Sequence, residues 1–218
     1  MSSPKEASKE APAKPAPAAK PAVQSKPVCK VVFLGAAGVG KTSIINRFMY
    51  DQFTRNYETT VGIDYFTKPM NVDDRTVNLQ IWDTAGQEQF QSLVPSYIRT
   101  SAITILVYDV SDPKTLESAK MWYEKVIEMR GNDVRCVLVG NKLDLSVNVQ
   151  DSAVKEFIDP IKMPHIQVSA KTGENITELF TKAVHEVSDS DLAKKDSITV
   201  QAQPIVTVAQ EGKSTGCC

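Results

Sequence analysis

The chain has 218 residues, of which 42% are hydrophobic, and its 25 Lys and Arg nearly balance its 26 Asp and Glu, for a net charge of −1. That length and composition suit one packed domain with flanking segments. The balanced charge gives no electrostatic case for a nucleic-acid partner, and without an apolar run of 18 residues no membrane-spanning segment is expected.

The first 27 residues are almost all Ala, Pro, Lys, Ser and Glu. Such a composition buries too little apolar surface to offset chain entropy, so residues 1–27 are predicted to be a disordered arm. A solvated spacer and a specific binding arm both stay open for it. The arm has no apolar core of a secretory signal, and Ser2 replaces the glycine that myristoylation requires.

From residue 28 to about residue 188 the chain alternates strand and helix signals. Short β-branched or apolar runs predict strands at 29–34, 62–72, 75–82, 102–108, 135–140 and 166–168. Helical spacing of apolar residues predicts helices at 43–50, 113–131, 150–158 and from 175 onward. This order predicts an α/β fold with a doubly wound, mostly parallel six-stranded sheet and one antiparallel edge strand. Ligands of such sheets bind at the carboxyl ends of the strands.

Several local features refine these elements. Asp112-Pro113 is a typical helix start, and Gly131 a typical end. Asn175 with Glu178 resembles a capping box at the start of the last helix. Cys29 and Cys136 lie in apolar strand-like runs, so buried inert thiols in a reducing, cytosolic setting are expected.

Residues 35–42 read Gly-Ala-Ala-Gly-Val-Gly-Lys-Thr, the spacing of a phosphate-binding loop. Gly35 and Gly40 permit backbone angles that turn N–H groups toward phosphates. Lys41 supplies a compact cation for the β- and γ-phosphates, and Thr42 a hydroxyl for Mg²⁺. The loop joins a predicted strand to a helix N-terminus, which itself favours an anion.

A second motif, Asp83-Thr84-Ala85-Gly86-Gln87, follows the strand that ends at Trp82. Asp83 is placed to hold Mg²⁺ through a water, and the Gly86 N–H to contact a γ-phosphate. Gln87 can orient a water for in-line attack. Taken alone, this pentapeptide could also be an ordinary Asp-capped turn.

A third motif, Asn141-Lys142-Leu143-Asp144, follows the strand that ends at Gly140. A carboxylate at Asp144 can accept hydrogen bonds from N1–H and N2–H₂ of guanine, and adenine lacks both donors, so a dry site would reject adenine. The Lys142 stem can lie over the base. After the last strand, Ser169-Ala170-Lys171 can offer a backbone N–H to O6. An exposed turn is the alternative for the tetrapeptide alone, but three motifs in one sheet predict guanine-nucleotide binding.

Residues 28–188 resemble a Ras-superfamily small GTPase, and more narrowly a Rab. The resemblance rests on the three motifs, on Tyr57-Glu58-Thr59-Thr60-Val61-Gly62-Ile63-Asp64 and on a terminal Cys-Cys. It implies that Thr60 reaches Mg²⁺ and the γ-phosphate, that Phe53 stacks on guanine, and that Tyr57 covers the phosphates. The residues assigned to GTP are Ala37, Gly38, Val39, Gly40, Lys41, Thr42, Ser43, Phe53, Tyr57, Thr60, Gly86, Asn141, Lys142, Asp144, Ser169, Ala170 and Lys171. The residues assigned to the metal are Thr42, Thr60 and Asp83, and those assigned to catalysis are Gln87, Lys41 and Gly86.

The same resemblance implies an effector surface formed by Tyr65, Trp82 and Tyr97, with Tyr65 in place of the usual Phe. Plain hairpin packing is the alternative reading of these three aromatic residues. Residues 92–99 are similar to those of the subfamily-six Rabs of the Golgi. Ala37 stands where Ras has a glycine to which catalysis is sensitive, but Rabs vary here among small residues, so loss of activity does not follow. Because Gln87 is retained, the resemblance implies slow intrinsic GTP hydrolysis that an activating protein raises.

Residues 189–218 read as a flexible tail that ends in Cys217-Cys218. This ending is not a C-a-a-X box, but it resembles the Rab site of double geranylgeranylation, and two lipid chains give the stable anchoring that one does not. A pair of idle thiols is the alternative.

The resemblance implies a monomeric GTP/GDP switch on the cytosolic face of an intracellular membrane, at the Golgi, with a soluble cytosolic pool. Its implied partners are an exchange factor, a GTPase-activating protein, a GDP-dissociation inhibitor, a prenylation escort and effectors of vesicle trafficking. Three alternatives to this function are a Rab of another compartment, a module that holds GTP without hydrolysing it, and a small-molecule kinase with a phosphate-binding loop. The kinase would need an acceptor pocket and an Arg-rich lid, and no such insertion is present in the sequence.

Overall fold

A computed structural model of the chain describes residues 26–55, 60, 62–84, 94–131 and 134–192. Within these residues one six-stranded sheet runs in the order β2-β3-β1-β4-β5-β6. Only the β2–β3 pair at one edge is antiparallel, and every other neighbouring pair is parallel. The strands are β1 (Val28–Leu34), β2 (Ile63–Val72), β3 (Arg75–Thr84), β4 (Ile103–Asp109), β5 (Cys136–Asn141) and β6 (His165–Gln167). The predicted fold class is confirmed.

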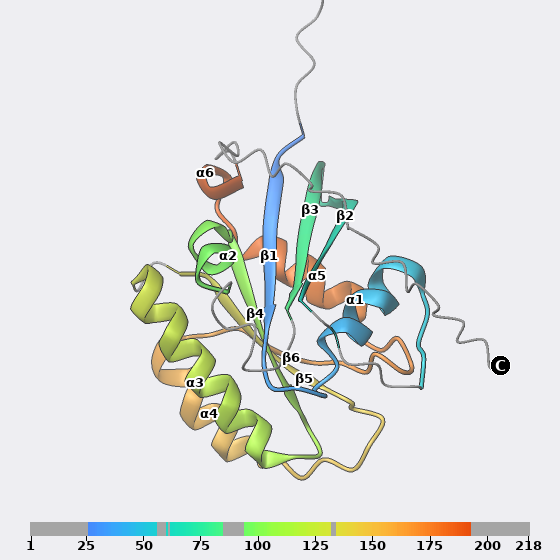
Figure 1. Cartoon of the computed structure of the whole chain (residues 1–218), viewed down its shortest axis with the longest axis vertical. Coiled ribbons are helices and arrows are strands. Elements are labelled where there is room, and N and C mark those ends of the chain that lie inside the picture. Colours follow the sequence, from blue (N-terminus) through green and yellow to red (C-terminus); the bar gives the residue numbers. More distant parts are fainter. Residues whose placement is uncertain (1–25, 56–59, 61, 85–93, 132–133, 193–218) are drawn as a thin grey trace, which may run out of the picture.

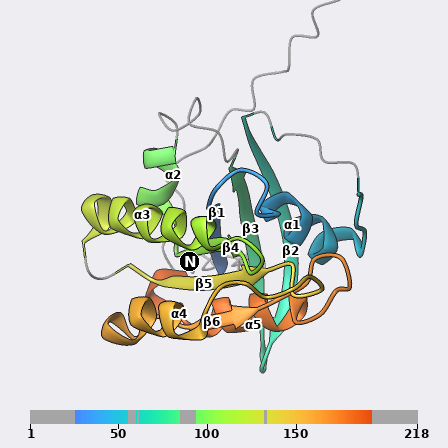
Figure 2. The ribbon, with the colours of Figure 1, turned by 90° about the horizontal axis from the view of Figure 1, so that it is seen from below.

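Helices cover both faces of the sheet (Figure 1, Figure 2). The helices are α1 (Lys41–Tyr50), α2 (Val94–Thr100), α3 (Pro113–Arg130), α4 (Asp151–Ile158), α5 (Ile176–His185) and α6 (Asp189–Leu192), with a 3₁₀ turn at Asp159–Ile161. One core cluster joins α1 and α5 to one face, and a second joins α2, α3 and α4 to the other. None of the helices in the described part of the chain has both the length and the apolar character needed to cross a membrane.

Strand β1 shows how the sequence produces this layering. Val31 and Phe33 belong to the α1/α5 cluster, whereas Val32 and Leu34 belong to the α2/α3/α4 cluster. Side chains of a strand alternate between faces, so a strand covered on both sides needs a continuous apolar run. The last four residues of β1, 31–34, are fully buried, and the strand is followed directly by the loop that begins at Gly35.

Three local features differ from the sequence-based expectations. The capping box at α5 is wrong: Asn175 has φ 58°, makes no side-chain cap hydrogen bond, and its amide instead donates to the Gln167 carbonyl at 2.9 Å. Helix α2 was not predicted, since its seven residues are too few to establish a helical period. Residues predicted as the start of the tail form α6, because Leu192 packs into the α1/α5 core cluster.

The two internal cysteines are buried, as predicted. Burial raises the pKa of Cys29 to about 12, although nearby Arg75 acts in the opposite direction. Burial likewise raises the pKa of Cys136 to about 12. Both thiols are therefore neutral at physiological pH and behave as small apolar side chains.

Candidate nucleotide-binding site

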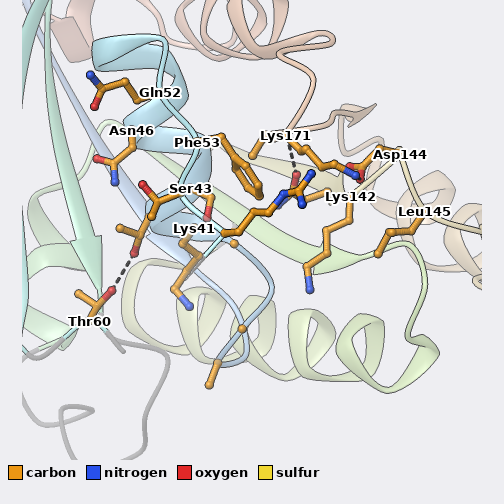
Figure 3. A pocket seen from close by; sticks show the side chains of 18 of the residues that line it. Lys41, Ser43, Asn46, Gln52, Phe53, Thr60, Lys142, Asp144, Leu145 and Lys171 are labelled. Atoms are coloured by element: carbon orange, nitrogen blue, oxygen red, sulfur yellow. Dashed lines mark hydrogen bonds and ion pairs between the residues drawn. The ribbon is translucent and has the colours of Figure 1, made fainter. Parts of the chain in front are cut away.

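A pocket of about 600 Å³ lies at the carboxyl ends of β1, β3, β5 and β6, where a doubly wound sheet is expected to hold its ligand. Figure 3 shows Ser43 and Thr60 toward one end of it and Asp144, Leu145 and Lys171 toward the other. The lining residues are Ala37, Gly38, Gly40, Lys41, Thr42, Ser43, Asn46, Gln52, Phe53, Thr54, Arg55, Thr60, Thr84, Asn141, Lys142, Asp144, Leu145, Ala170 and Lys171. The pocket thus joins the three sequence motifs in one space.

Two glycines in the loop between β1 and α1 have no room for a side chain. A Cβ at Gly35 would lie 2.3 Å from the Val107 carbonyl oxygen, and the backbone there has φ +148°. A Cβ at Gly40 would lie 2.3 Å from Asn141 Nδ2, and φ is +94°. The backbone therefore passes close to β4 and β5, and its N–H groups are free to turn toward an anion.

Lys41 lies inside this loop. Its Nζ donates to the carbonyls of Gly35 at 3.0 Å and Ala36 at 2.9 Å. Burial lowers the pKa of Lys41 to about 8, an effect that the nearby Asp83 carboxylate partly offsets. A phosphate would restore the full positive charge, because an adjacent anion favours the ammonium form. The loop therefore holds a cation ready for a phosphate.

The oxygen atoms predicted to bind Mg²⁺ converge on one point. The Thr42 hydroxyl donates to Asp83 Oδ2 at 2.6 Å and lies 2.7 Å from the Thr60 hydroxyl. Asp83 is fully buried, and its second oxygen, Oδ1, has no hydrogen-bond partner. Burial raises the pKa of Asp83 to about 6 despite the opposing effects of Thr42 and Lys41. A cluster of oxygens with a buried carboxylate in need of a counter-charge fits a hard divalent cation.

The base-recognition motif is assembled at the opposite end of the pocket. Asp144 accepts a hydrogen bond from the Ser169 hydroxyl at 2.6 Å and an ion pair from Lys171 at 3.0 Å. Desolvation opposes ionisation of Asp144, but Ser169 and Lys171 outweigh it and lower the carboxyl pKa. The side chain is therefore a fixed carboxylate, as an acceptor for two guanine N–H donors must be.

Asn141 connects the two ends of the pocket. Its amide nitrogen donates to the Val39 carbonyl at 2.9 Å, and its amide oxygen accepts the Ala170 N–H at 3.1 Å. The side chain is almost fully buried, so both bonds are made away from water. One residue thereby fixes the spacing between the phosphate loop and the loop that follows β6.

Comparison with known protein families agrees with this geometry. The model of the Ras family matches residues 30–189, well over half of the chain. The chain belongs to the Ras family. Membership establishes a guanine-nucleotide-binding switch with GTPase activity as the general function, with Mg²⁺ as the typical cofactor of the family.

Within this Ras-family site, most of the predicted nucleotide-binding residues line the pocket, but Val39 and Ser169, together with the predicted metal residue Asp83, do not line it. Val39 and Ser169 are fully buried and act through the carbonyl and hydroxyl bonds described above. Asp83 is buried behind Thr42. When Mg²⁺ is bound it can neutralise developing charge on the phosphates, and Thr42, Thr60 and Asp83 are the residues of this chain that would hold it.

Some predicted residues fall outside the described part of the chain. These are Tyr57, Gly86, Gln87, Cys217 and Cys218. Their assigned roles stay predictions.

Phe53 lies in the pocket as predicted, at 36% exposure, which leaves a ring face for a base. The Lys142 side chain also lines the pocket, and its Nζ pairs with Asp109 Oδ2 at 2.6 Å. Asp109 was not predicted. Burial alone would raise its pKa, but Lys142 and the Ser111 donors lower it, so it is a permanent anion that orients the lysine stem. Its position at the end of β4 was the available signal, since loops at strand ends hold the ligand.

Six further lining residues had no role predicted from the sequence: Asn46, Gln52, Thr54, Arg55, Thr84 and Leu145. Thr84 lies inside the motif at 83–87, and the other five lie within five residues of a motif or of a predicted ligand, so proximity along the chain was the only signal for those five. Thr84 has a clear structural task as well, since its hydroxyl donates to the Phe33 carbonyl at 2.6 Å and joins the ends of β3 and β1.

The three aromatic residues proposed as an effector surface lie together. The ring centroids of Tyr65 and Trp82 are 4.6 Å apart, and those of Trp82 and Tyr97 are 4.7 Å apart, with interplanar angles of 48° and 45°. Tyr65 and Trp82 are direct partners across the β2–β3 hairpin, and Tyr97 comes from α2. Trp82 also packs against the α2/α3/α4 core cluster, as the alternative of hairpin packing requires, and the role of the three residues as an effector surface stays a prediction.

Proposed function

We propose that this Ras-family GTPase is a Rab-type switch that is anchored by two C-terminal lipid chains and recruits effectors in vesicle trafficking at the Golgi. The observation that carries the Rab assignment is the contiguous aromatic cluster of Tyr65, Trp82 and Tyr97. It spans β2, β3 and α2, and Tyr65 is 47% exposed. Aromatic surfaces of this kind are favoured at protein interfaces.

The cluster lies next to the metal-binding residues. Trp82 is the neighbour of Asp83 in β3, and Tyr65 is paired with Trp82 in the register that pairs Asp64 with Asp83. Thr60, whose hydroxyl lies 2.7 Å from that of Thr42, is three positions before the first residue of β2. A γ-phosphate with Mg²⁺ would hold Thr60 and Asp83, and its loss would release Thr60, so effectors reading the cluster could sense the nucleotide.

The reaction is proposed to be in-line attack of a water on the γ-phosphate, with Gln87 orienting that water and Lys41 stabilising the charge on the phosphates. The intrinsic rate is slow and is raised by an activating protein that supplies an arginine in trans. Single-turnover hydrolysis with Mg²⁺ should slow by at least about tenfold in Gln87→Leu, while the affinity for GTP stays similar. Equal rates in the two proteins would remove Gln87 from this role, and no hydrolysis in the native protein, even with an activating protein, would favour a GTP-holding module.

Membership in the Ras family counts against the small-molecule kinase.

Membrane anchoring and compartment are tested together in cells. Replacing both Cys217 and Cys218 with Ser should shift the protein from membranes to the cytosol. Either single replacement should leave only part of the protein in the membrane fraction, because one lipid chain binds a membrane only marginally. Unchanged membrane recovery of the double variant would overturn the anchoring proposal. Co-localisation of the native protein with another organelle's marker would favour a Rab of that compartment.

A further inference from the structure

Arg47 makes contacts that none of the motifs anticipates. It lies on α1, and its Nε donates to the Ala170 carbonyl at 2.9 Å while its Nη2 donates to the Lys171 carbonyl at 2.6 Å. These partners are 123 and 124 residues away along the chain. The guanidinium thus donates two hydrogen bonds side by side to the backbone of the loop after β6, a geometry that Arg provides and Lys does not.

The loop that Arg47 binds, Ser169–Lys171, also orients the Asp144 carboxylate. Ser169 and Lys171 both bond to the Asp144 carboxylate, and Arg47 bonds to the carbonyls of Lys171 and of Ala170, which lies between these two residues. A shift of the loop would move both donors away from Asp144. Arg47 therefore acts on base recognition without reaching the base itself.

The other end of the connection is the phosphate site. Arg47 is six residues beyond Lys41 on the same ten-residue helix, which begins inside the phosphate loop. A helix of this length is stiff, so the Arg47 bonds hold the base loop at a fixed distance from the phosphate loop. Asn141 makes the second connection between the same two loops, from Val39 to Ala170. The phosphate loop and the base loop are therefore connected twice, once through Arg47 and once through Asn141, around the pocket for the nucleotide.

Arg47 also bonds at the end of its own helix, but these bonds do not explain why its side chain is mostly buried. Its Nη1 also bonds to the carbonyl and the carboxylate of Asp51, both at 2.9 Å, at the end of α1. The Asp51 side chain is 92% exposed, and such a surface pair contributes little. The Arg47 side chain itself is only 16% exposed, because it is turned under the base loop.

We propose that Arg47 is a positioning residue that fastens the loop at Ser169–Lys171 to α1 and so governs how tightly guanine is recognised and how fast nucleotide leaves. The loss of two charge-assisted bonds should let the loop open more often, which raises the rate of GDP release. It should also weaken discrimination between bases, because Asp144 would lose its fixed orientation.

The test compares Arg47→Ala with the native protein, using GDP that carries a fluorescent label. With Mg²⁺ and excess unlabelled GDP, release should be at least about tenfold faster in the variant. Arg47→Lys should fall between the two, since a lysine keeps the charge but not the paired donors. The ratio of dissociation constants for inosine diphosphate, which lacks the 2-amino group, and GDP should fall about threefold or more in Arg47→Ala.

Lys68→Ala is the matched control. Lys68 Nζ donates to the Phe48 carbonyl at 2.5 Å, so it ties the same end of α1 to β2. This variant should destabilise α1 without changing the ratio between the two nucleotides. The proposal is overturned if Arg47→Ala leaves release and the ratio within twofold of the native values, or if Lys68→Ala changes both as much.

Discussion

The Thr42 hydroxyl donates a 2.6 Å hydrogen bond to Asp83 Oδ2 across 41 residues of sequence, and Asp83 Oδ1 is buried with no partner. This arrangement prepares a cation site and makes it sensitive to protons. Burial raises the pKa of Asp83 from 3.8 to about 6, so a proton competes with the metal in mildly acidic solution.

The first prediction concerns Mg²⁺ and pH. The affinity of the GDP-bound protein for Mg²⁺ should fall as pH drops below about 6, by up to about tenfold per pH unit, because the carboxyl must release its proton to meet the cation. Calorimetric Mg²⁺ titrations at pH 5, 6 and 7.5 measure this. The phosphates of GDP also titrate in this range, so Asp83→Asn is the control. That variant should bind Mg²⁺ about 10- to 100-fold more weakly and show only the pH dependence of GDP.

The raised pKa of Asp83 also makes the folding stability depend on pH, but stability falls as pH rises, whereas Mg²⁺ affinity falls as pH drops. The folded, metal-free protein holds the Asp83 proton more tightly than the unfolded chain does, so this group's contribution is full below pH 3.8 and is lost as pH rises to about 6. Asp83→Asn should remove that loss. A native protein whose pH dependence matches that of the variant would show that Asp83 ionises normally.

The second prediction concerns the base. Asp144→Asn should lower the affinity for GDP by at least about a hundredfold. The carboxylate can accept hydrogen bonds from both guanine N–H groups, whereas the amide would set its own N–H group against one of them. Binding of xanthosine diphosphate should improve, since xanthine has a carbonyl where guanine has its 2-amino group. Competition assays with both nucleotides and ADP provide the measurement. An unchanged GDP affinity would contradict the role of Asp144.

The residues that the three motifs predicted share one property: each lies at or after the carboxyl end of a strand, whereas Phe53 and Thr60 were predicted from the family resemblance alone. Lys41, Asp83 and Asp144 each follow a recognisable apolar run, and parallel strands bring their carboxyl ends to one edge. The mostly parallel sheet with one antiparallel edge strand was also predictable, because alternating strand and helix signals leave few topologies.

Arg47 and Asp109 could not be predicted in this way. The partners of Arg47 are backbone carbonyls more than 120 residues away, and a carbonyl has no sequence signature. Asp109 meets Lys142 only because β4 and β5 are neighbours in register, so the ends at Asp109 and Asn141 lie side by side. Asn175 was mispredicted because its side chain bonds to β6 and not to its own helix.

The third prediction contrasts two glycines of the phosphate loop. Gly35→Ala should destabilise the nucleotide-free protein by at least about 3 kcal/mol, because its Cβ would meet the Val107 carbonyl oxygen, a backbone atom that cannot move aside. Gly38→Ala should cost only about 1–2 kcal/mol, since nothing lies within 4 Å of its Cβ and only the positive φ is unfavourable. Urea unfolding of both variants without nucleotide gives the comparison. Equal losses would mean that backbone angle, and not close packing against β4, governs the loop.

The fourth prediction uses the buried thiols. The pKa of Cys29 and that of Cys136 are raised from 9.0 to about 12 by burial, so the folded state keeps two protons that the unfolded chain loses. Each thiol's stabilising contribution is full below pH 9.0 and is lost as pH rises to about 12, at about 1.4 kcal/mol per pH unit. Cys29→Ala and Cys136→Ala should each flatten that slope, measured by urea unfolding between pH 8 and 10. Iodoacetamide at pH 8 should leave both thiols unmodified in the folded protein and modify them in urea. Their rapid modification in the native protein would show that the strands carrying them open far more often than a packed core allows.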